Sequence, residues 1–571
     1  MKKLSLLNFR LLIVWTIITS AMLGLAGKIF LLQFLKTAEF KKKANVQQNE
    51  EIRIDNPRRS IIDNEGNILA MDTVKYDLFI YRDRLPKDED KEKIAKQLSE
   101  ILNKNYDDLT KLLLDKKNVN RVGLDKITTH EYQRILNNTT KKYRRAFEFI
   151  KNFDRSYPQK ELMSDVVGFV NDNQQGKAGI EMSQNNLLHR QTKYITVRKT
   201  GSGGIIPTSL PTNFFRSNDW KLQLTVNMRL QRAARFALKE KLNIFKAKRG
   251  AIIIMNVMDG SILALVCEPT FDPNVFYNAK SELLKNWAVT DLYEPGSTFK
   301  PINIALALEA GVIESNTLIQ DVGFIKVDNW NIHNASLAGN GLINIAEVLQ
   351  TSSNVAMVQI MQRLKKEDYY SRLLKLDITQ KTNIDIPGEV RGQLKNKEVF
   401  TKGSIEAAAT SFGQGFSLTP IKLAQLHAAL ANGGKLVTPH LTKGLVNLEG
   451  SLAWTPEYKI KQIFSPSVSK KVMELMETVV NKGSGKASKI QGYRIGGKTG
   501  TAQKAGKGGY LPDSKITSFV SILPITSPKY LVLVVLDEPK GNNTSGSTVA
   551  APAAKVVTDA LIYIEGLPPA K

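Results

Sequence analysis

The spacing of apolar and polar positions first separates the N-terminal segment from the rest of the chain. From Leu11 to Gly27, about 17 residues run without a charged side chain, and the apolar stretch IFLLQFL continues after Lys28. That length fits a membrane span, whereas a cleavable signal peptide has a shorter apolar region that ends in small residues. GLAGK is a faint candidate for such an end. The pattern favours an uncleaved transmembrane anchor over 11–35 with a cytoplasmic tail over 1–10.

A second segment, 45–215, combines short alternating runs with charged helical patterns. YDLFIYR at 76–82 alternates with the period of a strand, and 89–116 is rich in Lys, Asp and Glu at helical spacing. The stretch TGSGGIIPTSLPTN at 200–213 has the Gly, Ser and Pro content of a linker or long loop. We expect 45–215 to form an α+β domain that ends at this stretch.

A third segment, 219–571, begins and ends with strand patterns. Two apolar runs around Asp259 and Gly260 predict a hairpin. Helical patterns dominate 298–435, and further strands and a last amphipathic helix follow at 516–524, 530–538 and 549–565. The order predicts an antiparallel sheet whose terminal strands meet, with an all-helical insert.

Composition adds a strong positive charge but no cofactor chemistry. The 80 Lys and Arg against 54 Asp and Glu give a net charge of +26, which favours an anionic neighbour such as lipid or an acidic polymer, or equally a solvated lysine-rich face. No basic box interleaved with aromatic residues indicates nucleic acid, so we expect no nucleic-acid partner. The single Cys267 excludes an internal disulfide, and the five histidines show no metal-ligand spacing. We expect neither a metal nor another cofactor.

The stretch YEPGSTFKP at 293–301 places a hydroxyl and an amine one helical turn apart. Pro301 is tolerated only in a first turn, so a helix should begin near Ser297 and end at Gly311. Ser297 then lies at a helix N-terminus, and Lys300 faces the same side. A neutral Lys300 could take the serine proton if burial beside a second cation lowers its pKa.

Two later stretches supply a polar relay and a second lysine. TSSN at 351–354 precedes an apolar helix, and GGKTGTAQK at 496–504 should be a strand whose glycines allow close approach to a ligand. Each motif alone is common: SxxK recurs by chance, SxN begins many helices, and KTG can be a turn. Their occurrence together and in this order is specific, and it is known from class A β-lactamases and penicillin-binding proteins.

Further stretches extend this match across nearly the whole chain. SFGQGFSLTP at 411–420 and LDEPKG at 536–541 resemble boxes of the class B penicillin-binding proteins, the monofunctional D,D-transpeptidases of peptidoglycan synthesis. Upstream, the resemblance includes the pedestal boxes of that family, which correspond here to PRRSIIDNEGNILA (57–70), RSYP (155–158) and GKAGIE (176–181). Three positions depart from the family pattern: Ser60 replaces a glycine, Asn64 replaces an arginine, and NNTSGSTVAAP (542–552) has one glycine where a pair is usual.

The resemblance implies a fold and a reaction. The expected fold is α/β (α+β), a serine β-lactamase-like transpeptidase domain with a five-stranded antiparallel sheet and a helical subdomain, preceded by an elongated α+β pedestal and one transmembrane helix. The expected reaction cross-links stem peptides ending in D-Ala-D-Ala through a serine acyl-enzyme that β-lactams block.

The resemblance also implies a role for each site residue. Ser297 would be the nucleophile, Lys300 the general base, Ser352 a proton relay, and Asn354 a holder of Lys300 and the substrate amide. Lys498, with Thr499, Gly500 and Thr501 beside it, would bind the terminal carboxylate. The backbone amides of Ser297 and Thr501 would form the oxyanion hole. The residue that activates the acceptor amine is not identified.

The sequence is also compatible with other functions of the same fold. A β-lactamase would not need an anchor and a pedestal, and no deacylating glutamate can be assigned. A sensor should have several spans, and an inactive scaffold should have lost a catalytic box. SFGQG with LTP, and DEPKG, look more like the division-specific (FtsI-type) members than the elongation members. This reading predicts septal glycan polymerase and divisome membrane proteins as partners, and a single-pass plasma-membrane protein with its catalytic domain on the periplasmic side.

Overall fold

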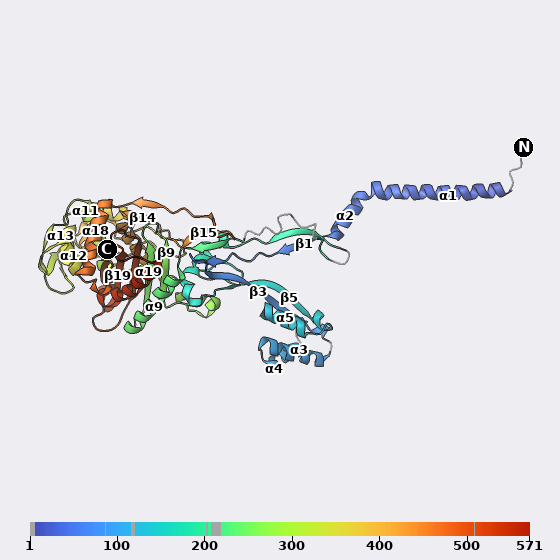
Figure 1. The fold of residues 1–571 in the computed structure, drawn as a ribbon, viewed down its shortest axis with the longest axis horizontal. Coiled ribbons are helices and arrows are strands. Elements are labelled where there is room, and N and C mark those ends of the chain that lie inside the picture. The colour runs from blue at the N-terminus through green and yellow to red at the C-terminus, as the bar shows by residue number, and fades with distance from the viewer. Residues whose placement is uncertain are drawn as a thin grey trace. The chain divides into compact units, whose positions relative to one another are not determined.

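The computed structural model describes residues 6–85, 87–115, 120–200, 204–206, 219–506 and 509–570 (Figure 1). The chain forms two compact units. One contains Met1–Pro57 and Arg190–Asn218, and the other contains Arg58–His189 and Asp219–Lys571. Residues 58–189, expected in the pedestal, thus share a compact unit with the expected transpeptidase domain.

The first unit holds the apolar helix and a two-stranded sheet. Helix α1 (Leu6–Phe30) continues through a π-helical turn (Leu31–Leu35) into α2 (Thr37–Gln48). Strand β1 (Asn49–Ile54) then pairs antiparallel with β6 (Lys193–Arg198). The apolar span Asn8–Leu35 has 28 residues, which at 1.5 Å per residue is about 42 Å and exceeds the hydrocarbon core of a bilayer. None of its most apolar window is buried, as a single-pass membrane anchor requires.

A second helical stretch, Gly546–Glu565, is also apolar enough to span a membrane, but half of its window is buried. It contains α19 (Ala551–Glu565), whose Val557 and Leu561 pack in the core of the second unit. The apolar residues of this helix are therefore explained by packing in the core of the second unit.

The second unit begins with a sheet and helices from 58–189. Strand β3 (Ile68–Tyr81) pairs with β2 (Ile61–Ile62), β4 (Arg121–Thr128) and β5 (Phe147–Ser156). Helices α3 (Asp88–Leu102), α4 (Tyr106–Leu114) and α5 (Thr129–Asn138) pack with this sheet around a core that includes Leu78, Leu98 and Ile135. The short helices α6 (Ser164–Val167), α7 (Gly179–Ser183) and α8 (Asn185–Leu188) follow. The expected strand is confirmed up to Tyr81, and two helices lie within the expected helical stretch 89–116, whose last residue is outside the described residues.

The three upstream boxes meet in one buried ion cluster. Glu181 accepts hydrogen bonds from Arg58 Nε at 2.6 Å and from Arg155 Nε at 2.7 Å. Arg155 Nη1 also donates to Asp72 at 3.0 Å, and all four side chains are at most 2% exposed. Such a cluster is stable only when each charge is paired, so the boxes specify local folding.

The other half of this unit is built on a five-stranded antiparallel sheet in the order β18-β19-β20-β8-β9. The strands are β8 (Arg249–Asn256), β9 (Ile262–Glu268), β18 (Gly496–Gly506), β19 (Gly509–Leu523) and β20 (Tyr530–Asp537). Alternate residues face two cores: Ile252 and Ile254 pack with α9 (Met228–Phe245) and α19, and Ile253 and Met255 pack with α17 (Pro420–Ala431) and α18 (Pro466–Asn481). The expected sheet and the hairpin around Asp259 are confirmed.

Short strands connect this half to 58–189. Strand β7 (Lys221–Leu224) pairs in parallel with β2 and antiparallel with β15 (Thr442–Val446), which continues the sheet to β16 (Leu452–Trp454). Strands β14 (Lys435–Val437) and β17 (Ile460–Gln462) form a separate pair.

The insert between the sheet strands contains helices and two small hairpins. Its helices are α10 (Trp287–Thr290), α11 (Lys300–Glu309), α12 (Ile345–Thr351), α13 (Asn354–Met361), α14 (Lys366–Lys375), α15 (Lys397–Lys402) and α16 (Ile405–Ser411). The expectation of an all-helical insert was wrong. Strand β10 (Leu318–Asp321) pairs with β13 (Gly341–Asn344), and β11 (Phe324–Val327) pairs with β12 (Trp330–His333). Four-residue strands with one or two buried positions carry too short a pattern for recognition.

Candidate active site

The turn that carries Ser297 is fixed by close backbone contacts. It is a 3₁₀ turn, η8 (Gly296–Phe299), that leads into α11, with Pro301 in the first helical turn as expected. Gly296 has φ +58° and donates its N–H to the Gly413 carbonyl at 2.9 Å. A Cβ on Gly413 would lie 2.0 Å from the Gly296 oxygen, so only glycine permits this approach. The loop SFGQGF thereby holds the Ser297 turn in place.

Two buried polar side chains hold the backbone of the same turn through hydrogen bonds. The Thr298 hydroxyl donates to the Pro295 carbonyl at 2.7 Å, and His427 Nε2 donates to the Thr298 carbonyl at 2.8 Å. Burial lowers the pKa of His427 to about 4, so its ring is neutral. Among the described residues the Ser297 hydroxyl has no hydrogen-bond partner, and its side chain is partly exposed. It is therefore available to an incoming ligand.

Lys300 lies fully buried one turn beyond Ser297. Its Nζ donates to the Ser352 carbonyl at 2.5 Å, to Asn354 Oδ1 at 2.7 Å and to Ser352 Oγ at 3.2 Å. Burial lowers the pKa of Lys300 well below its usual value, and the charge of Lys498 lowers it further. Burial is thus the larger cause of the lowered pKa, and the second cation expected from the sequence is the smaller cause.

Lys498 approaches the same serine from β18. Its Nζ donates to Ser352 Oγ at 2.9 Å and to the Thr499 carbonyl at 3.2 Å. The side chain is fully buried, and burial lowers the pKa of Lys498 to about 7. The two amines therefore flank one hydroxyl, and both lone pairs of Ser352 Oγ accept hydrogen bonds.

The loop that carries Ser352 and Asn354 is held in an uncommon conformation. Ser352 has φ +57° at the C-terminus of α12, and the Ser353 hydroxyl caps α13 by accepting from the Ala356 N–H at 2.9 Å. Asn334 accepts from the Asn354 N–H at 2.9 Å and from the Ser353 hydroxyl at 3.2 Å. A strained residue that its surroundings hold this firmly is typical of a functional site.

The KTG strand lies against the Ser297 turn. A Cβ on Gly500 would lie 2.9 Å from Thr298 Cγ2 and 3.2 Å from the Pro295 carbonyl, and a Cβ on Gly296 would lie 3.4 Å from the Thr501 carbonyl. The Thr499 hydroxyl is 2.7 Å from Ser484 Oγ, and Thr501 Oγ1 accepts from the Gly546 N–H at 3.0 Å. The strand thus lies with Gly500 and Thr501 against the turn that carries Ser297.

The single glycine of NNTSGSTVAAP lies at the position that requires one. A Cβ on Gly546 would lie 2.5 Å from the Gly500 carbonyl and 2.7 Å from the Ser518 carbonyl. The glycine that this loop keeps is therefore one that its close backbone contacts require.

Sequence reasoning missed Asn334, Ser484 and His427. Asn334 lies in the hairpin region that was expected to be helical and also donates to Asp321 at 2.9 Å. None belongs to a catalytic box, and only the fold brings them to the site.

These observations define a class of protein. Two amines around one serine, beside a serine at a helix start, on a five-stranded antiparallel sheet, are the arrangement of the active-site-serine penicillin-recognising enzymes. The comparison with known families agrees. Residues 250–559 match the penicillin binding protein transpeptidase domain, and residues 53–213 match the penicillin-binding protein dimerisation domain. The chain belongs to the penicillin-binding protein transpeptidase family.

Individual relatives refine this assignment. The chain is similar to a "Peptidoglycan D,D-transpeptidase FtsI homolog" from Mesostigma viride, with 38% identity over 100% of this chain and 98% of that protein. It is 29% identical to the stage V sporulation protein D of Bacillus subtilis over 93% of this chain and 82% of that protein.

Solved structures share the fold. A peptidoglycan synthetase from Bifidobacterium adolescentis has a TM-score of 0.70 at 22% identity and covers 92% of this chain and 98% of its own. Penicillin binding protein 3 from Mycobacterium tuberculosis complexed with aztreonam has a TM-score of 0.68 at 22% identity, with 91% and 98% covered.

Proposed function

We propose that this chain is a division-type peptidoglycan D,D-transpeptidase and that Ser297 forms its acyl-enzyme. The observation that carries the assignment of the site is the pair of hydrogen bonds that Ser352 Oγ accepts from Lys300 and Lys498. They join the three motifs in one buried polar centre. The FtsI-type relatives support the substrate, a peptidoglycan stem peptide, and β-lactams as inhibitors.

Acylation follows from the protonation states of the two amines. A neutral Lys300 takes the proton of the Ser297 hydroxyl as Oγ attacks the carbonyl of the penultimate D-alanine. Once Lys300 carries that proton, Ser352 Oγ accepts from both amines, and its O–H is free to donate to the leaving nitrogen. The C–N bond to the terminal D-alanine breaks, and Lys300 returns the proton through Ser352. Asn354 Oδ1 holds the Lys300 amine during the transfer.

Lys498 and its strand bind the end of the substrate. In the free protein the pKa of Lys498 is about 7, and an incoming carboxylate stabilises its ammonium form. Thr499 and Thr501 add hydroxyl groups, and Gly500 lets the strand lie close to the Ser297 turn. The backbone N–H groups of Ser297 and Thr501 form the oxyanion hole, where one donor is typically worth about 10² to 10³ in rate.

The remaining proposals concern the membrane location, the domains and the partners of the protein. The apolar helix α1 anchors the chain once in the membrane, and the catalytic domain, 219–571, lies on the side that contains peptidoglycan. The pedestal domain is 45–215. The expected partners are a septal glycan polymerase and other divisome membrane proteins.

Labelling with a fluorescent penicillin tests the proposed nucleophile. The wild-type protein and a Ser281→Ala control, changed at an exposed serine outside the site, should both become covalently labelled. Ser297→Ala should not. Equal labelling of Ser297→Ala and wild type would exclude Ser297 as the nucleophile. Rapid turnover of the penicillin would instead indicate a β-lactamase.

A further inference from the structure

Asp321 is a buried carboxylate that belongs to none of the three motifs. It lies at the end of β10 and is 1% exposed. It accepts hydrogen bonds from the Gly323 N–H at 2.9 Å, from Asn334 Nδ2 at 2.9 Å and from Asn340 Nδ2. No cation of the described residues forms an ion pair with it. Burying a charge without a cation beside it costs free energy, so packing alone does not account for a carboxylate at this position.

The carboxylate of Asp321 is ionised at neutral pH. Burial raises its pKa, but the hydrogen bonds from Asn340, from the Gly323 N–H and from the remaining donors outweigh burial and lower the pKa below its usual value. Asp321 therefore carries a full negative charge over the whole pH range in which an acylating serine would be active.

A chain of hydrogen bonds joins Asp321 to Lys300. Since Asn334 donates its Nδ2 to Asp321, its Oδ1 faces the loop before α13, where it accepts from the Asn354 N–H at 2.9 Å. Asn354 in turn accepts from Lys300 Nζ at 2.7 Å through Oδ1, and it donates Nδ2 to the His333 carbonyl at 3.0 Å. Because a carboxylate can only accept, Asp321 fixes the orientation of the Asn334 amide and, through it, the loop that holds Lys300.

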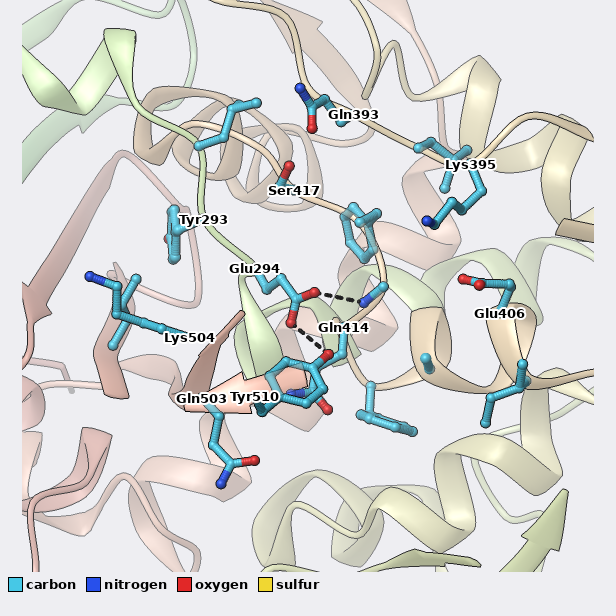
Figure 2. Close-up of a pocket in the computed structure, with 18 of the residues that line it drawn as sticks. Tyr293, Glu294, Gln393, Lys395, Glu406, Gln414, Ser417, Gln503, Lys504 and Tyr510 are labelled. Atoms are coloured by element: carbon cyan, nitrogen blue, oxygen red, sulfur yellow. Dashed lines mark hydrogen bonds between the residues drawn. The ribbon is translucent and has the colours of Figure 1, made fainter. Parts of the chain in front are cut away.

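Asp321 is also the acid whose charge acts on Lys300. Burial and the charge of Lys498 from β18 lower the pKa of Lys300, and the charge of Asp321 from β10 opposes both. Two other acids, Glu294 and Glu406, line a groove of about 1010 Å³ that Figure 2 shows, and neither contributes to the pKa of Lys300. Among the acids of the described residues, Asp321 is thus the one placed to stabilise an ammonium at Lys300.

Acylation needs both protonation states of Lys300 in turn. The neutral amine takes the proton of Ser297, and the resulting ammonium then lies close to the ammonium of Lys498 until the proton moves on through Ser352. Two buried ammonium groups destabilise each other, and a fixed carboxylate nearby offsets part of that cost.

We propose that Asp321 is a positioning residue for acylation. Through Asn334 it orients the loop that carries Asn354, and its negative charge stabilises the ammonium that Lys300 forms when it takes the serine proton. The inference rests on the proposed transpeptidase function and deepens it, because it assigns a source of negative charge to the same site.

The pH dependence of penicillin acylation separates the charge of Asp321 from its hydrogen bonds. The second-order rate constant for a fluorescent penicillin is measured with the full chain in detergent between about pH 5 and pH 10. The fall in rate at low pH, the acid limb, reports protonation of Lys300. In Asp321→Asn the maximal rate should fall about tenfold, and the acid limb should move to lower pH because the ammonium is no longer stabilised. Asp321→Glu, which keeps the charge, should retain the acid limb of the wild type.

Further variants separate charge from geometry. Asn334→Ala removes the link to Asn354 and keeps the carboxylate, so it should slow acylation without moving the acid limb. Asn340→Lys places an ammonium on the carboxylate from an exposed position and should move the limb to lower pH, whereas Asn340→Gln, with a neutral donor, should not. Glu314→Gln, at an exposed acid seven residues before Asp321, should change neither the rate nor the limb.

Three outcomes would overturn the inference. The first is an acid limb that stays at the wild-type pH in folded Asp321→Asn. The second is an equal movement of the limb in Asn334→Ala, which would assign the effect to geometry. The third applies if Asp321→Asn does not fold, and it is an unmoved limb in Asn340→Lys. Absence of acylation in the wild type would instead contradict the proposed function.

Discussion

Replacing Lys498 by methionine should stabilise the protein while it abolishes acylation. Lys498 is fully buried on β18, and it donates to Ser352 Oγ at 2.9 Å and to the Thr499 carbonyl at 3.2 Å. Methionine has a similar length and no charge. The substitution therefore removes the burial of a titratable amine together with two hydrogen bonds.

The magnitude follows from the lowered pKa. Below pH 7 the ammonium is buried, and lowering its pKa from 10.5 to about 7 costs about 5 kcal/mol at 1.36 kcal/mol per pH unit. Between pH 7 and 10.5 the unfolded chain binds more protons than the folded one, so the cost falls as pH rises. It is about 2 kcal/mol at pH 9. Two lost hydrogen bonds offset about 2 kcal/mol. Lys498→Met should thus be about 3 kcal/mol more stable than wild type at pH 6 and equally stable at pH 9.

Urea unfolding at the two pH values tests this prediction. Fluorescence of Trp287, a buried residue of the same unit that is 8% exposed, reports the unfolding transition. Trp287→Phe, made in the wild type and in Lys498→Met, is the control that assigns the signal. Penicillin acylation of the folded variant should be absent. A variant less stable than wild type at pH 6, or a stability difference that does not change with pH, would refute the reasoning.

Three other predictions concern the supports of the site. Gly546→Ala should lower stability by about 1 to 3 kcal/mol and slow acylation, since its Cβ would meet the Gly500 and Ser518 carbonyls; unchanged melting and labelling would contradict this. Asn334→Ala should cost about 2 kcal/mol and slow acylation about tenfold, as it removes the acceptor of the Asn354 N–H, and stopped-flow labelling would reveal a normal rate if this is wrong. Arg155→Met should lower stability by about 3 to 5 kcal/mol because it leaves a buried charge poorly paired, and a melting temperature within error of wild type would count against it.

The sequence alone was sufficient to predict the antiparallel sheet, the membrane span and the three motifs of the site. Strands such as YLVLVVLDE are long and apolar, and the span is long and uncharged, so their patterns are clear. Ser297, Lys300 and Lys498 could be assigned to one site because their motifs occur together and in a characteristic order.

The supports of the site could not be predicted in the same way. The hairpins around Asn334 are four-residue strands, too short for a periodic signal. The contact between Gly296 and Gly413 and the unpartnered Tyr293 hydroxyl depend on tertiary approach, which no local pattern encodes.

The protonation state of Lys300 in the resting protein tests the central claim most directly. In protein labelled with ¹³C at lysine Cε, comparison with Lys300→Met and Lys498→Met assigns the two buried amines. The account predicts that the Lys300 resonance of the resting protein titrates well below pH 10.5, so that a neutral amine is present to take the Ser297 proton. A Lys300 resonance that titrates with the exposed lysines near pH 10.5 would contradict it.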